Sequence, residues 1–103
     1  MNAEPKVRIA VDHGDIAGFC RRNGVRRLAF FGSVLRDDFS PESDVDVLVE
    51  FLPDAHVSLF DMARMQNELS AIVGRAVDLR TLQELSRYFR DDVAAEAVEE
   101  YVA

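Results

Sequence analysis

Two stretches of the chain carry apolar residues at the spacing of an amphipathic helix. The first follows Asp12, a suitable N-cap residue, and ends at Asn23-Gly24. The second follows Ser58, with Asp61 three residues later in capping-box position, and ends at Gly74. The apolar positions of these stretches are Ile16, Phe19 and Cys20, and then Met62, Met65, Leu69 and Ile72. The pattern predicts two helices that each pack one apolar face against the rest of the protein.

Three shorter stretches have the patterns of β-strands. Leu28 to Phe31 are apolar without a break and end at a glycine, which predicts a central strand. Residues 44–51 and residues 75–80 alternate between polar and apolar positions. Strands and helices therefore follow one another along a short chain, which predicts an α/β domain.

The two ends of the chain have weaker patterns. Near the start, Val7, Ile9 and Val11 alternate with other residues and predict a short extended lead-in. Near the end, Thr81 and Glu84 form a second capping box, which predicts a C-terminal helical region that Asp91-Asp92 divides into two helices. The apolar residues of this region are Leu82, Leu85, Phe89, Val93, Val98 and Tyr101.

The strand at residues 44–51 carries two acidic residues close together. Because strand side chains alternate, Asp44 and Asp46 project to one face, and the apolar residues Val45, Val47, Val49 and Phe51 project to the other. Neighbouring carboxylates repel each other, and a hard cation such as Mg²⁺ is the usual relief. Asp78 in the third strand is a candidate third carboxylate. An ordinary exposed strand acid remains the alternative for Asp78.

A Gly-Ser pair follows the central strand and supplies groups that suit phosphate. Gly32 lets the backbone approach a ligand closely, and Ser33 offers a hydroxyl and free N–H groups at the start of an expected short helix. Arg36, one turn later, either contacts a phosphate or pairs with an acid of the loop at residues 37–43, which is expected to be exposed. Metal and phosphate ligands together indicate nucleotide chemistry.

Composition narrows the class of protein. With 103 residues, the chain is expected to form one domain over residues 1–103. The net charge of -7 and the pI near 4.7 argue against a surface that binds a nucleic-acid backbone. No export signal or membrane span is apparent, and Cys20 has no cysteine partner, so we expect a cytoplasmic protein. The only basic cluster is Arg21, Arg22, Arg26 and Arg27, either a solvated helix end or a group aimed at a triphosphate or a partner.

The order Gly-Ser, ten residues, Asp-x-Asp, set between apolar strands, resembles the active-site signature of the DNA polymerase β-like nucleotidyltransferase superfamily. Within it, the chain looks most like a minimal nucleotidyltransferase (MNT) domain, over nearly its whole length. The resemblance implies an α/β (α+β) palm-like fold, a small mixed sheet with helices packed on it. It also implies two Mg²⁺ ions and ATP as substrate. The implied catalytic and metal-binding residues are Asp44, Asp46 and Asp78, and the implied nucleotide-binding residues are Gly32, Ser33, Arg36 and Ser43.

The resemblance further implies a reaction and a partner. Relatives of this kind are commonly the antitoxin half of a pair whose other member is a HEPN-domain ribonuclease. We therefore expect transfer of AMP from ATP to a hydroxyl of a HEPN toxin, most specifically a tyrosine. Two alternatives stay open: an antitoxin that neutralises its partner by contact alone, and a nucleotidyltransferase that acts on a small molecule or RNA. The latter relatives generally carry an added acceptor domain, for which 103 residues leave no room.

Overall fold

The computed structural model describes residues 7, 9–36, 39–85, 87–88 and 90–103. Among these residues, none of the helices has the length and apolar character needed to cross a bilayer. The elements in chain order are helix α1 (His13–Arg22), strand β1 (Val25–Phe31), the 3-10 turn η1 (Gly32–Leu35), β2 (Val45–Phe51), α2 (Leu59–Val73), β3 (Val77–Thr81), the 3-10 turn η2 (Leu82–Glu84), α3 (Arg90–Glu96) and β4 (Val98–Val102).

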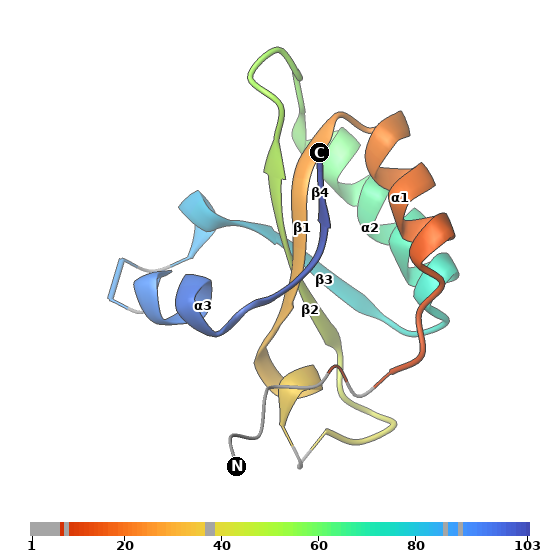
Figure 1. Ribbon diagram of the computed structural model, residues 1–103, viewed down its shortest axis with the longest axis vertical. Coiled ribbons are helices and arrows are strands. Elements are labelled where there is room, and N and C mark those ends of the chain that lie inside the picture. Colours follow the sequence, from red (N-terminus) through yellow and green to blue (C-terminus); the bar gives the residue numbers. More distant parts are fainter. Residues whose placement is uncertain (1–6, 8, 37–38, 86, 89) are drawn as a thin grey trace.

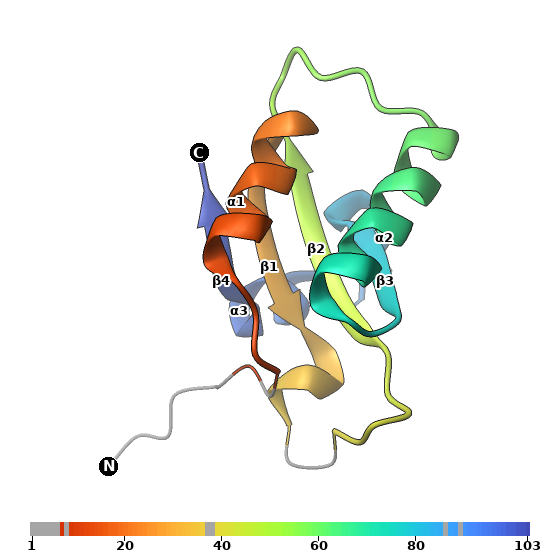
Figure 2. The same cartoon turned by 90° about the vertical axis from the view of Figure 1, so that its right-hand side faces the viewer.

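A four-stranded sheet in the order β3-β2-β1-β4 forms the centre of the molecule. β1 pairs antiparallel with both β2 and β4, whereas β2 pairs parallel with β3 through the crossover helix α2. Helices α1 and α2 cover one face of the sheet, and α3 lies on the other side (Figures 1 and 2). The expected small mixed sheet with helices packed on it is confirmed, with β1 as an interior strand.

The two predicted amphipathic helices pack as expected. Their apolar stripes meet the inner face of the sheet, where Ile16, Phe19, Cys20, Met65 and Leu69 are buried with Leu28, Phe30, Val45, Val47 and Val49. The Asp12 side chain accepts a hydrogen bond from the Asp15 N–H, and Ser58 with Asp61 forms the complete capping box. Gly74 ends α2 in the left-handed conformation. The capping residues and the apolar faces therefore place both helices where the sequence predicts them.

The prediction of a helical C-terminus is wrong for its last part. Val98 and Tyr101 lie in β4, and the capping box of Thr81 and Glu84 opens only the three-residue turn η2. Two glutamates of β4 favour a helix, but its Val and Tyr residues favour a strand, and β4 supplies hydrogen-bond partners to the outer edge of β1. Pairing with the sheet thus decides the conformation of this segment. Phe89, expected in this region, lies outside the described residues.

The lead-in at the N-terminus does not join the sheet. Residues 7 and 9–11 have no strand pairing, and Val7, Ile9 and Val11 are partly buried against the core instead. Their apolar side chains account for the alternating pattern without a fifth strand.

Candidate active site

The predicted acids meet where β1 ends and β2 and β3 begin. Asp46 is opposite Phe31 in the β1–β2 pair and opposite Asp78 in the β2–β3 pair, and Asp44 directly precedes β2. Val45 and Val47, on either side of Asp46, are buried beneath α1 and α2. Because strand side chains alternate, Asp46 and Asp78 face the opposite side, toward α3. The fold therefore brings residues 32 positions apart into register.

The electrostatics of Asp46 reflect an excess of negative charge. The pKa of Asp46 is raised above its usual value, first by burial and then by the charges of Asp78 and Asp44. The guanidinium groups of Arg36 and Arg80 oppose this rise. A cation bound nearby would stabilise the ionised form of such a carboxylate. Carboxylate oxygens are also ligands that Mg²⁺ prefers. Asp44 and Asp46 thus fit the donor chemistry of a magnesium site.

The Gly-Ser turn is built directly against this acid pair. Gly32 has φ +74, and a Cβ placed on it would stand only 2.2 Å from Oδ2 of Asp46. Glycine is required here both for the left-handed backbone and for the space. The Ser33 hydroxyl lies 3.5 Å from the carbonyl oxygen of Asp44, within donating range. The two halves of the sequence motif are therefore one structural unit.

Asp78 is held by an arginine that the sequence analysis did not single out. Arg80 donates from Nε and from a terminal nitrogen to the two Asp78 carboxylate oxygens, at 3.0 and 3.3 Å. The hydrogen bonds and charge of Asp78 raise the pKa of Arg80. Within the described part of the chain, no three or more His, Cys, Asp or Glu side chains gather closely enough to hold a metal ion. Asp78 is beside the acid pair but is engaged by Arg80.

The described part of the loop after Arg36 is exposed at Pro41 and Glu42, as expected, and half-buried at Phe39, Ser40 and Ser43. Asp37 and Asp38 lie outside the described residues, but Ser40 and Ser43 are half-buried and close a turn. The Ser43 hydroxyl accepts from the Ser40 N–H at 3.1 Å. Arg75 donates to the Ser40 carbonyl oxygen at 2.5 Å and stacks on the Phe39 ring. Ser43, predicted to bind nucleotide, therefore has a turn-closing contact in this structure.

A hollow of about 450 Å³ opens beside the Gly-Ser turn, lined by Gly32, Leu35, Arg36 and Glu96. Arg36 thus faces the space next to Gly32 and also acts on Asp46 through its charge. Glu96 of α3 is a site neighbour that no sequence signal indicated, because only the fold brings α3 over this end of β1. The hollow therefore brings together Gly32 and Arg36, two of the residues expected to bind nucleotide, with the carboxylate of Glu96 beside them.

Three arginines of the basic cluster form ion pairs with acidic residues of the protein, which favours a structural role over contact with a triphosphate. Arg22 pairs with Glu68 of α2, Arg26 pairs with Glu50 at 3.4 Å, and Arg27 pairs with Glu99 at 2.6 Å. These pairs are partly exposed and join neighbouring elements. The solvated structural role is therefore the better description of these three arginines.

The site combines a turn that suits phosphate with paired carboxylates at the ends of strands. This combination is typical of enzymes that bind and react with nucleotides. The family model described as "Nucleotidyltransferase domain" matches residues 16–103. A protein of Methanocaldococcus jannaschii, named for protein adenylyltransferase activity, is 36% identical over 78 residues, which cover 76% of this chain and 82% of that protein. The chain belongs to the nucleotidyltransferase domain family and is a nucleotidyltransferase.

Solved structures share the fold. A toxin–antitoxin crystal structure with AMP-PNP matches with a TM-score of 0.72 at 18% identity, over 90% of this chain and 75% of that chain. The tri-AMPylated HEPN toxin of Shewanella oneidensis in complex with its MNT antitoxin matches with a TM-score of 0.63 at 18% identity, over 88% of this chain and 70% of that chain. At this identity the likeness shows a common fold, in agreement with the predicted palm-like architecture.

Proposed function

We propose that this protein is an antitoxin that transfers AMP from ATP, with Mg²⁺, to a tyrosine hydroxyl of a HEPN-domain partner. The single observation that carries the proposal is the contact between Gly32 and Asp46, which sets a phosphate-seating turn against two carboxylates. In this proposal, residues 1–103 form one catalytic domain that acts in the cytoplasm and does not bind nucleic acid.

Each residue has a distinct part in the proposed reaction. Asp44 and Asp46 would hold the two Mg²⁺ ions, and the bound metal would supply charge neutralisation at the phosphates. Gly32 and Ser33 seat the phosphates, and Arg36 faces the hollow beside them. Ser43 adds a contact to the nucleotide through its hydroxyl, which also accepts from the Ser40 N–H. The turn and the acids thus orient the α-phosphate for attack.

The transfer itself exchanges one P–O bond for another. The tyrosine oxygen attacks the α-phosphorus and forms a new O–P bond. The bond from that phosphorus to the bridging oxygen of the β-phosphate breaks, and pyrophosphate leaves with the electron pair. Asp78 completes the acid set and accepts the hydroxyl proton once Arg80 shifts from its carboxylate. No oxidant or further reactant is required.

The acceptor is assigned from the relatives and from charge. The curated relative is named for protein adenylyltransferase activity, and the Shewanella complex pairs an MNT antitoxin with an AMPylated HEPN toxin. A net charge of -7 disfavours RNA as an acceptor held through its backbone. A protein that carries its own docking surface suits a small catalytic domain better.

One incubation tests the proposal. The protein is mixed with α-labelled ATP and a HEPN-domain protein encoded in the same genome, with Mg²⁺ or with excess chelator. We expect label on the HEPN protein only when Mg²⁺ is present, and none with a HEPN variant whose tyrosines near the catalytic residues are Phe. Label that remains with chelator, or that appears on added RNA instead, contradicts the proposal.

A contact-only antitoxin is the second candidate, and one observation favours it. In this structure Asp78 is paired with Arg80, so the three acids are not assembled into one cage. The candidates differ in what the acids do. A contact-only antitoxin inhibits its partner equally well when Asp44 and Asp46 are both Asn, whereas the enzyme does not.

A further inference from the structure

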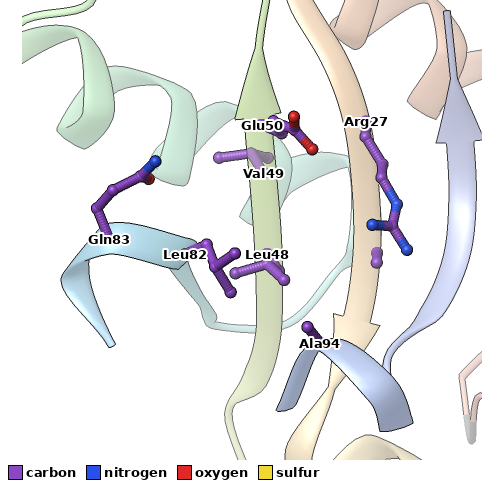
Figure 3. A pocket seen from close by; sticks show the side chains of 8 residues that line it. Arg27, Leu48, Val49, Glu50, Leu82, Gln83 and Ala94 are labelled. Atoms are coloured by element: carbon purple, nitrogen blue, oxygen red, sulfur yellow. The ribbon is translucent and has the colours of Figure 1, made fainter. Parts of the chain in front are cut away.

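A small cavity lies on the same side of the sheet as Asp46 and Asp78, beneath η2 and α3. Its volume is about 130 Å³. Figure 3 shows the side chains of Leu48 and Leu82 pointing toward each other, with Ala94 of α3 below them, and all three line the cavity. An apolar cavity of about 150 Å³ accommodates a benzene ring. The size and lining of this cavity therefore suit one aromatic ring.

The cavity and the phosphate hollow lie on opposite sides of Asp46. Leu48 follows Asp46 by two residues on the same face of β2, so their Cα atoms are about 7 Å apart. In the other direction, Gly32 abuts Asp46 and lines the hollow. Helix α3 borders both spaces, through Ala94 at the cavity and Glu96 at the hollow. The two spaces therefore form a row with the acid between them.

This row matches the geometry of in-line displacement at phosphorus. The attacking oxygen and the leaving oxygen lie on opposite sides of the phosphorus atom. If pyrophosphate leaves on the side of Gly32, the acceptor oxygen arrives from the side of Leu48. We infer that the cavity holds the aromatic ring of the acceptor tyrosine, with its hydroxyl directed at Asp46 and Asp78. This inference rests on the proposed function.

The lining favours a phenol ring over the nucleobase. The apolar wall residues carry no side-chain hydrogen-bonding group. The polar side chains lie at the rim: Arg27, whose Nε donates to Glu99, Glu50, which pairs with Arg26, and Gln83. A purine base has polar atoms along its edges that need partners, whereas a tyrosine ring has one polar atom, which here leaves the cavity toward the acids. Gln83 at the rim is available to the peptide that carries the tyrosine.

Tyrosinamide is a minimal probe for this site. With the protein saturated by Mg-AMP-PNP, it is titrated while backbone amide signals are followed by NMR. We expect the largest shifts at Leu48, Leu82 and Ala94, a result that needs no variant. Ala94→Phe fills the cavity and is expected to weaken tyrosinamide binding by about tenfold or more, because the ring loses its apolar site. Ala95→Phe, on the exposed neighbour, is the matched control and is expected to bind like the parent.

Three results overturn the inference. The first is that tyrosinamide shifts amide signals of other residues, and the second is that it shifts none while AMP-PNP is bound. Either result shows that the ring does not bind in the cavity. The third is that adenosine displaces tyrosinamide and shifts the signals of Leu48, Leu82 and Ala94. That result would assign the cavity to the nucleobase instead. Nucleotide binding is measured separately by calorimetry. If Mg-AMP-PNP does not bind, the proposed function itself fails, and the basis of this inference goes with it.

Discussion

A methyl group added at Gly32 tests whether the contact between the Gly-Ser turn and Asp46 is needed for nucleotide binding. Gly32 has φ +74, where a residue with a Cβ is disfavoured by about 1–2 kcal/mol. The added Cβ also stands 2.2 Å from Asp46 Oδ2, so the carboxylate must move. For a domain of this size each kcal/mol lowers Tm by roughly 4–8 °C. We therefore expect Gly32→Ala to lower Tm by at least about 4 °C and to abolish binding of Mg-AMP-PNP.

Gly74 provides a matched control for the backbone effect. Its φ is +78, but nothing lies within 4 Å of an added Cβ. Gly74→Ala is expected to lower Tm by the same backbone cost and to leave nucleotide binding intact. Thermal denaturation and calorimetric titration of both variants give the comparison. If folded Gly32→Ala binds Mg-AMP-PNP like the parent, or if Gly74→Ala also loses binding, the contact of Gly32 with Asp46 is not what nucleotide binding requires.

Three further predictions concern the acids. Asp46→Asn is expected to abolish Mg-AMP-PNP binding in calorimetry yet to raise Tm at pH 7. The reason is that the pKa of Asp46 is raised in the fold, so its stabilising contribution is present below the unfolded-state pKa and is lost as pH rises through the folded-state pKa. For the same reason, metal-dependent nucleotide binding should weaken on acidification at a higher pH than the 3.8 of an ordinary Asp; a profile that follows an unshifted carboxyl contradicts this. Asp78→Ala is expected to keep nucleotide binding while turnover falls by roughly 10²–10⁴; unchanged turnover returns Asp78 to the ordinary surface acids.

Much of the site could be predicted because its signals are local. The alternation of residues 44–51 gives the facing of Asp46, and the capping residues give the helix bounds. Gly32 stands out as a glycine between an apolar strand and a serine. The pairing of Asp78 with Arg80 was also within reach, because alternation places residues two apart in a strand on one face.

Other features depend on contacts between distant parts of the chain. Val98–Val102 becomes a strand because β1 has an open edge, which no local pattern reveals. Ser43 and the loop before it are held by Arg75, more than 30 residues later. Glu96 and the ring-sized cavity beneath α3 likewise follow from where the chain returns over the sheet. These features require the three-dimensional arrangement.

We propose that this protein, through Asp44 and Asp46, transfers AMP to a HEPN-domain partner. Intact-mass spectrometry of that partner, co-expressed with the parent protein or with the Asp44→Asn/Asp46→Asn variant, tests it most directly. With the parent protein we expect one or more AMP additions and loss of the partner's ribonuclease activity. With the double variant we expect an unmodified, active partner. A partner that is unmodified yet fully inhibited, with the parent and with the double variant alike, would show that this protein acts by binding alone.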